Sequence, residues 1–120
     1  MQAKDVPDLP ILALIAQRPG VWHCWFPVGR HMPSIRPAMP AHTPDKVVLA
    51  KMRQLEKRDL ITGCTCGCRG DYEVTIKALA LLASQDCSQG HDMVTVKNME
   101  EEPARTWCQR CGVSEERTDG

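Results

Sequence analysis

One stretch decides the fold of the larger part of this chain: Thr43-Pro-Asp-Lys-Val-Val-Leu-Ala-Lys-Met-Arg-Gln-Leu-Glu-Lys-Arg-Asp-Leu-Ile61. Its start favours a helix, because threonine is a good N-cap, proline suits the first helical position and Asp45 favours the positive end of the helix dipole. Apolar residues recur with helical spacing and predict its buried stripe: Val47, Val48, Met52, Leu55 and Leu60.

The segments around this helix alternate between strand and helix signals. After it, a strand is expected from Ile61 to Cys68, with a turn at Arg69-Gly-Asp71, a partner strand over residues 72–75 and a helix over 76–83 capped by Thr75. Before it, we expect a helix over 9–18, a strand over 21–26 and a proline-rich stretch over 27–44 with one helical turn after Ser34. Leu9, Leu12, Ile15 and Ala16 would form the buried face of that first helix. These elements predict an α+β fold.

The order of elements resembles a winged helix-turn-helix. The residues that carry the resemblance are Leu55-Glu-Lys-Arg-Asp-Leu-Ile61, similar to the end of the family's recognition helix, and Tyr72-Glu-Val-Thr-Ile-Lys-Ala-Leu-Ala-Leu-Leu82, similar to its wing and closing helix. Asp59 and Ala78 stand where the family often has glycine. The resemblance covers about residues 6–84 and implies three helices with a small antiparallel sheet. In size and composition the chain resembles bacteriophage or actinobacterial regulators.

This resemblance implies a transcriptional regulator that docks the helix over 44–59 in the major groove of double-stranded DNA, with the wing reaching a neighbouring groove. The basic residues that would contact DNA, mostly at phosphates, are Lys46, Lys51, Arg53, Lys57, Arg58 and Arg69. Some winged helices bind only protein, so a protein-interaction module for a partner of transcription or replication is the alternative. The family is often dimeric, but no dedicated dimerisation helix is recognisable.

The tail carries a second signal, Cys108-Gln-Arg-Cys111, with Cys87 and His91 upstream. Two cysteines separated by two residues can supply half of a tetrahedral zinc site, and Cys87 and His91 supply the other half. Residues 93–96 and 105–107 are expected to pair as a hairpin around the acidic loop at residues 100–103. We therefore predict a zinc-ribbon-like module over residues 85–120, after a winged-helix domain over 1–84.

Four more cysteines suggest a second zinc site. Cys64, Cys66 and Cys68 alternate along a predicted strand and would share one face. Pairing of the first strand with the wing would bring Cys24 to them. A thiol-lined strand face without metal is the other interpretation, and a thiol redox sensor at Cys64, Cys66 and Cys68 is a third function hypothesis.

Charge and composition narrow the remaining choices. The net charge is zero, but residues 1–84 carry 11 Lys and Arg against 7 Asp and Glu, whereas residues 85–120 carry 4 against 8. Only residues 1–84, with their excess of positive charge, are therefore suited to bind a polyanion. No membrane span or signal sequence is recognisable, so we expect a cytoplasmic protein (in the host if viral), in which clustered thiols bind metal rather than form disulfides. No catalytic constellation is recognisable, and no enzyme is expected.

Overall fold

The computed structural model describes residues 2–17, 23–24, 34–63, 71–96 and 104–114. It has the predicted α+β class. Its elements, in chain order, are η1 (Ala3–Asp5), α1 (Asp8–Ala16), β1 (His23–Cys24), η2 (Arg36–Ala38), α2 (Asp45–Lys57), β2 (Ile61–Gly63), β3 (Asp71–Val74), α3 (Ile76–Ala83), β4 (Met93–Val96) and β5 (Arg105–Cys108).

The strands form two antiparallel sheets. The first has the order β1-β3-β2, with Cys24 opposite Asp71 and Ile61 opposite Val74. The second is the β4–β5 hairpin, in which Met93 pairs with Cys108. Both the pairing of the first strand with the later hairpin and the pairing of the two tail segments are confirmed.

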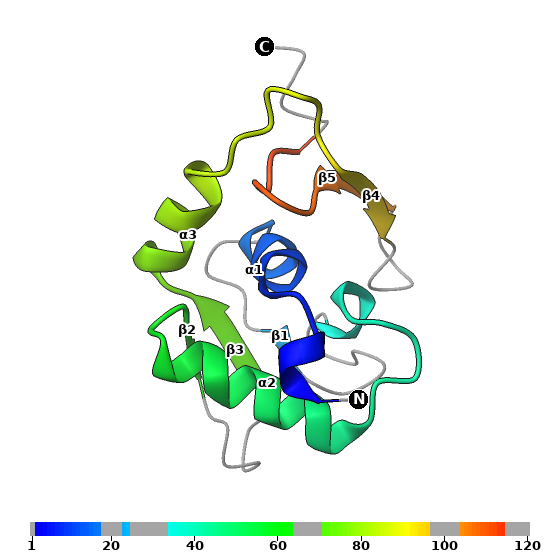
Figure 1. Cartoon of the computed structure of the whole chain (residues 1–120), viewed down its shortest axis with the longest axis vertical. Coiled ribbons are helices and arrows are strands. Elements are labelled where there is room, and N and C mark those ends of the chain that lie inside the picture. The colour runs from blue at the N-terminus through cyan, green and yellow to red at the C-terminus, as the bar shows by residue number, and fades with distance from the viewer. Residues whose placement is uncertain (1, 18–22, 25–33, 64–70, 97–103, 115–120) are drawn as a thin grey trace.

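Helix α1 lies at the centre of the molecule, between α3, the three-stranded sheet and the second hairpin (Figure 1). Five consecutive residues, 11–15, are buried, so every side of the helix faces the core. The prediction of one buried face was therefore incomplete, because a helix that is apolar all round is buried all round. Pro10 is accommodated in the first turn, where backbone N–H groups have no helical partner. In the described part of the chain, no helix is long and apolar enough to cross a membrane.

Helix α2 packs its apolar stripe inward through Val48, Met52 and Leu55, as predicted. Its N-cap, however, is Pro44 rather than Thr43. The Thr43 hydroxyl donates instead to the carbonyl of Pro40 at 2.6 Å. The start of the helix is held by Arg36, which donates to the carbonyl of Thr43 at 2.6 Å and pairs with Asp45. The start of α2 is thus joined to η2 by an ion pair, and no side chain among the described residues caps its first backbone N–H groups.

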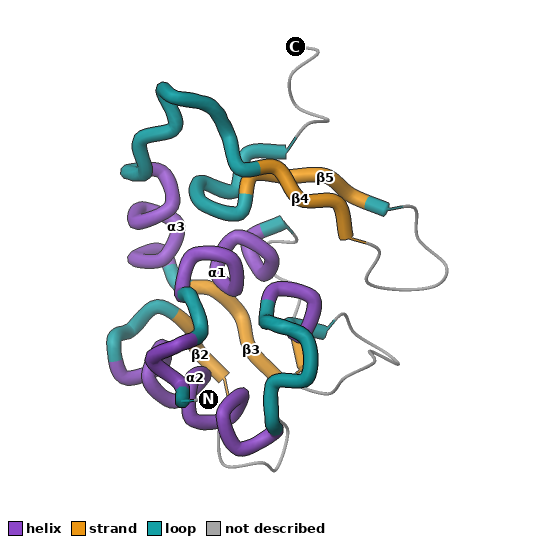
Figure 2. The backbone as a smooth tube through the Cα atoms, turned by 45° about the vertical axis from the view of Figure 1, so that its right-hand side comes forward, coloured by secondary structure: helices purple, strands orange, loops and turns teal. Residues whose placement is uncertain are grey.

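The β4–β5 hairpin lies beside α1 and extends the same core (Figure 2). Trp107, only 4% exposed, belongs to the cluster that contains Ile11, Leu14 and Tyr72. The Gln17 side chain at the end of α1 donates to the carbonyl of Gly112 at 2.7 Å. Residues 1–84 and the tail therefore share one apolar core instead of each having its own.

Candidate metal centre

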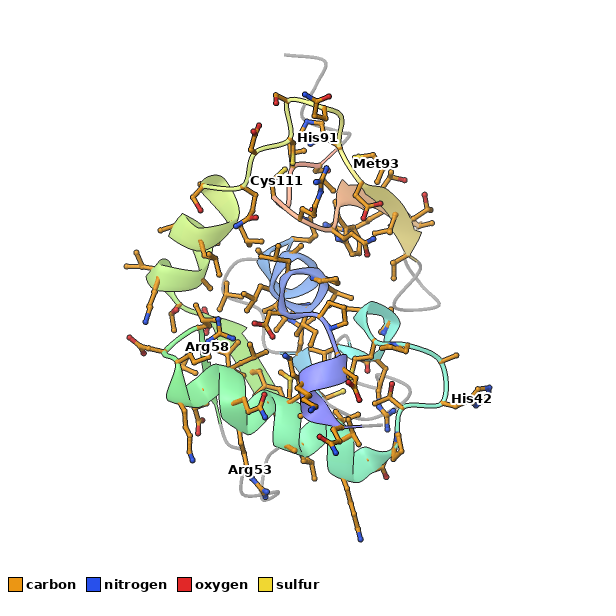
Figure 3. The ribbon with its side chains drawn as sticks, viewed as in Figure 1. His42, Arg53, Arg58, His91, Met93 and Cys111 are labelled. Atoms are coloured by element: carbon orange, nitrogen blue, oxygen red, sulfur yellow. The ribbon has the colours of Figure 1, made fainter. Side chains whose placement is uncertain are left out.

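The four predicted ligands of the tail come together at the end of the molecule opposite α2, where His91 and Cys111 lie close to each other (Figure 3). Cys87 and His91 lie in the connection between α3 and β4, and Cys108 and Cys111 lie at the end of β5 and in the turn after it. The β4–β5 register sets this arrangement, because Met93 opposite Cys108 brings the two connections to the same end of the hairpin.

Hydrogen bonds join the two halves of the cluster. The backbone N–H of Gln109 donates to the carbonyl of Asp92 at 2.9 Å, and the Arg110 side chain donates to the carbonyl of Gly90 at 2.7 Å. Each half is also a tight turn. Gly90 N–H donates to Cys87 O, and Gly112 N–H donates to Cys108 O. Both glycines have positive φ, of 119° and 81°, which favours glycine.

The donor atoms have the spacing of a tetrahedral metal site. All four lie within 4.8 Å of one another. The Sγ atoms of Cys87 and Cys108 are 3.8 Å apart, and Cys111 Sγ is 3.4 Å from His91 Nδ1. Tetrahedral bonds of about 2.3 Å to sulfur and 2.0 Å to nitrogen place two sulfurs about 3.8 Å apart, and sulfur and nitrogen about 3.5 Å apart. The cluster can therefore hold a metal ion with little rearrangement.

The surroundings of the thiols separate their pKa values. Burial acts to raise the pKa of Cys108, but the backbone N–H groups of Cys111 and Arg110 and the His91 side chain outweigh it and lower this pKa to about 6. Burial, together with the neighbouring Cys111 and Cys108 thiols, raises the pKa of Cys87 to about 11. Because a metal binds the thiolate, Cys108 is preset as a ligand, whereas Cys87 must lose a proton when metal binds.

The predicted DNA-contacting residues divide into two groups. Lys46, Arg53 and Lys57 are exposed on α2, and Arg53 extends from the side of α2 that faces away from α1 (Figure 3). Lys51 was predicted to contact DNA, but it is 4% exposed and pairs with Asp8, the first residue of α1. Its DNA contact stays a prediction, but Lys51 lies on the same side of α2 as the buried stripe. Arg58 pairs with the same carboxylate, although it keeps about half of its side-chain surface.

Asp8 was missed by the sequence reasoning. It accepts from both Lys51 and Arg58, and so joins the start of α1 to the middle and end of α2. Partial burial acts to raise its pKa, but the two cations outweigh burial and lower this pKa. An acid in the first turn of a helix is a common dipole signal, and nothing in the sequence distinguishes Asp8 from that ordinary role.

The second predicted metal site is only partly described. Cys24 is buried in β1 and lies opposite Asp71 in β3. Cys64, Cys66 and Cys68, like wing residue Arg69, lie outside the described residues. The second metal site and the redox role of these three cysteines stay predictions.

Comparisons with protein-family models, with curated proteins and with solved structures yield no match to this chain.

Proposed function

We propose that the chain is a winged-helix domain that binds double-stranded DNA through the exposed face of α2, with a structural zinc ion holding its C-terminal hairpin. The order of elements supports the fold assignment: a helix, a strand, a short helical turn, a helix, two strands and a helix. The three-stranded sheet has the order that the winged helix requires, with the first strand next to the last.

The observation that carries DNA binding is the position of the cations on α2. Successive helical residues are about 100° apart, so Lys46, Arg53 and Lys57 lie in one line along the helix, with the small Ala50 between them. That line is opposite to the side that buries Val48 and Leu55. A basic stripe on the outer face of a helix whose other face is anchored in the core suits phosphate contacts along a groove.

The ion pair between Lys51 and Asp8 removes Lys51 from the cations that the exposed face of α2 can offer to DNA. Because Lys51 is buried against Asp8 and Arg58 follows the end of α2 outside this line, the proposed DNA-contacting set is Lys46, Arg53 and Lys57, with Arg69 retained from the sequence. Asp8 then acts as a positioning residue, since its pairs set how α2 is oriented on α1.

Zinc is the metal that the cluster suits best. Three thiolates and one imidazole form a ligand set typical of structural zinc, and four protein ligands leave no position for a reacting water. The tail has few apolar residues besides Trp107, Val94 and Val96 in the core. Metal binding would therefore supply much of the free energy that keeps the hairpin folded.

The DNA test is a salt titration of binding to a fluorescently labelled duplex, read by anisotropy. The double variant Lys46→Ala plus Lys57→Ala should bind more weakly, and its dependence of log K on log salt should be shallower by about 2. The matched control is Lys4→Ala plus Lys77→Ala, which removes the same charge from exposed positions on η1 and α3. Absence of binding at low salt, or equal losses in both variants, overturns the DNA proposal.

The metal test is elemental analysis of the purified protein. We expect one zinc per chain from the tail cluster, lost in Cys108→Ser, and a second zinc only if Cys24 and the wing cysteines also bind. Cys24→Ala should leave the tail zinc in place. Protein without zinc, or with the same zinc content after Cys108→Ser, would exclude this site.

A further inference from the structure

The outward face of α3 is apolar, although the helix also buries its inner face. Between Ile76 and Ala83 the helix has a single polar residue, Lys77. Ala78 and Leu82 are buried against the core, whereas Ile76 is 85% and Leu79 42% exposed. With Ala80 and Ala83, which are also exposed, they form one strip at positions i, i+3, i+4 and i+7, here termed the α3 strip. A helix that is apolar all round normally has partners on both sides.

A pocket of about 460 Å³ adjoins this strip, and its lining joins apolar and basic groups: Arg58, Leu60, Lys77, Ala80 and Leu81. It is an open depression of the surface, not an enclosed cavity. Ala80 belongs to both the pocket and the α3 strip. An apolar side chain of a partner could rest on Ala80 and Leu81, with a carboxylate next to Arg58 and Lys77.

Hydrogen bonds between the end of α2 and the start of α3 preform this pocket. Lys77 Nζ donates to the carbonyl of Arg58 at 2.9 Å, and the Thr75 hydroxyl donates to the carbonyl of Asp59 at 2.6 Å. The backbone N–H of Thr75 also donates to Leu60 O at 3.1 Å. These bonds hold the lining residues in position before a partner binds, which reduces the entropic cost of binding.

We infer that the α3 strip and its pocket form a docking surface for an acidic amphipathic segment of a partner protein. Charge complementarity selects this occupant, since Lys77 and Arg58 border an otherwise apolar surface, and Arg58, although paired with Asp8, keeps 54% of its side-chain surface exposed. A second copy of the chain is a poorer fit. A symmetric interface presents the same patch from both sides, and the residues of this patch include no acid that could pair with Arg58 or Lys77. The surface lies on α3 and the end of α2, separate from the stripe of Lys46, Arg53 and Lys57.

The test uses a synthetic helical peptide with leucines at i, i+3, i+4 and i+7 and glutamates on both flanks. Binding of the labelled peptide to the zinc-loaded full chain is read by anisotropy. The affinity should fall at least about tenfold in Ile76→Ser plus Leu79→Ser, and at least as far in Lys77→Glu. Because these residues are exposed, circular dichroism should show an unchanged fold. The matched control is Met93→Ser on β4, where the side chain is 39% exposed, and it should bind as the unaltered chain does.

Two control peptides separate the contributions of charge and apolar contact. A peptide with lysines in place of the glutamates, and one with serines in place of the leucines, should both bind at least about tenfold more weakly. Equal binding of the lysine peptide, or binding unchanged by the Ile76 and Leu79 substitutions, overturns the inference. Sedimentation that shows a dimer dependent on Ile76 and Leu79 also overturns it, because the occupant is then a second copy. DNA binding is measured separately and has no bearing on this result.

Discussion

Replacing Asp59 with glycine should stabilise the protein. Asp59 follows α2 with φ of 63°, in the left-handed region. Its backbone N–H donates to Glu56 O, and Leu60 N–H donates to Leu55 O, both at 3.0 Å. These two bonds define a Schellman motif, in which glycine is the preferred residue at the position of Asp59. The buried Leu60 and Leu55 supply the apolar contact that accompanies the motif.

The expected gain can be assembled from its parts. Relief of the left-handed conformation contributes about 1–2 kcal/mol to the free energy of unfolding. The greater flexibility of glycine in the unfolded chain costs about 0.5–1 kcal/mol. Removal of a negative charge beyond the C-terminus of α2 adds about 0.3 kcal/mol. The net stabilisation of Asp59→Gly is therefore about 0.3–1.8 kcal/mol with a midpoint of about 1 kcal/mol, which corresponds to a rise in Tm of roughly 4 °C.

Urea denaturation of the zinc-loaded chain, followed by circular dichroism, measures this change. Asp59→Asn removes the charge and keeps a residue that tolerates positive φ, so it should gain only the small dipole contribution. Asp59→Ala keeps the conformational cost and should fall below Asp59→Gly by about 1 kcal/mol. The Thr75 hydroxyl bond goes to the backbone carbonyl and should survive in all three variants. If Asp59→Gly is no more stable than Asp59→Asn, the left-handed cap does not cost what this reasoning requires.

Three further predictions concern the core, the ion pairs and the metal centre. Trp107→Ala should lower the free energy of unfolding of the whole chain by about 3–5 kcal/mol in one transition; separate melting of the tail, with the remainder unchanged, would contradict a shared core. Asp8→Asn should reduce stability at neutral pH. The pKa of Asp8 is lowered in the folded state, so the charged carboxylate stabilises the fold above the unfolded pKa of about 4. This stabilisation is lost as pH falls through the folded pKa. Urea denaturation should therefore give the unaltered chain and Asp8→Asn converging free energies of unfolding in acid. Zinc affinity, measured by competition with a chelator, should increase between pH 6.5 and about 8.5, because the pKa of Cys87 is about 11 and its thiol must lose a proton when zinc binds. An affinity independent of pH would contradict this prediction. The control Cys24→Ala should show the same dependence of zinc affinity on pH as the unaltered chain.

The elements that the sequence predicted well are those with local signals. The helix over 76–83 follows from its apolar run and its cap, and the Thr75 hydroxyl does accept from the backbone N–H of Ala78 at 3.2 Å. The ligand set of the tail also follows from local spacing. Cys108 and Cys111 share one turn, and Cys87 and His91 share another, so only the pairing of the two turns needed the hairpin.

Two features of α2 that the sequence did not reveal have a common cause. Thr43 has the residue type of an N-cap, yet Arg36 and Asp45 hold the start of α2. Lys51 is basic and lies on the recognition-helix candidate, yet it is buried against Asp8, 43 residues earlier in the chain. Both outcomes depend on partners from other elements, and residue type and spacing along one helix do not reveal such partners.

The sequence by itself determined the α+β class, the positions of the main helices and the four tail residues that can hold a metal, because helical periodicity, caps and short ligand spacings act over a few residues. Only the tertiary structure decided that α1 is buried on all sides, that Trp107 joins the tail to the same core, and which cations of α2 face outward. These features depend on long-range packing and on Asp8, whose carboxylate engages Lys51 and Arg58. The stretch from Thr43 to Ile61 thus specifies a basic helix, and its neighbours decide which basic side chains can reach a ligand.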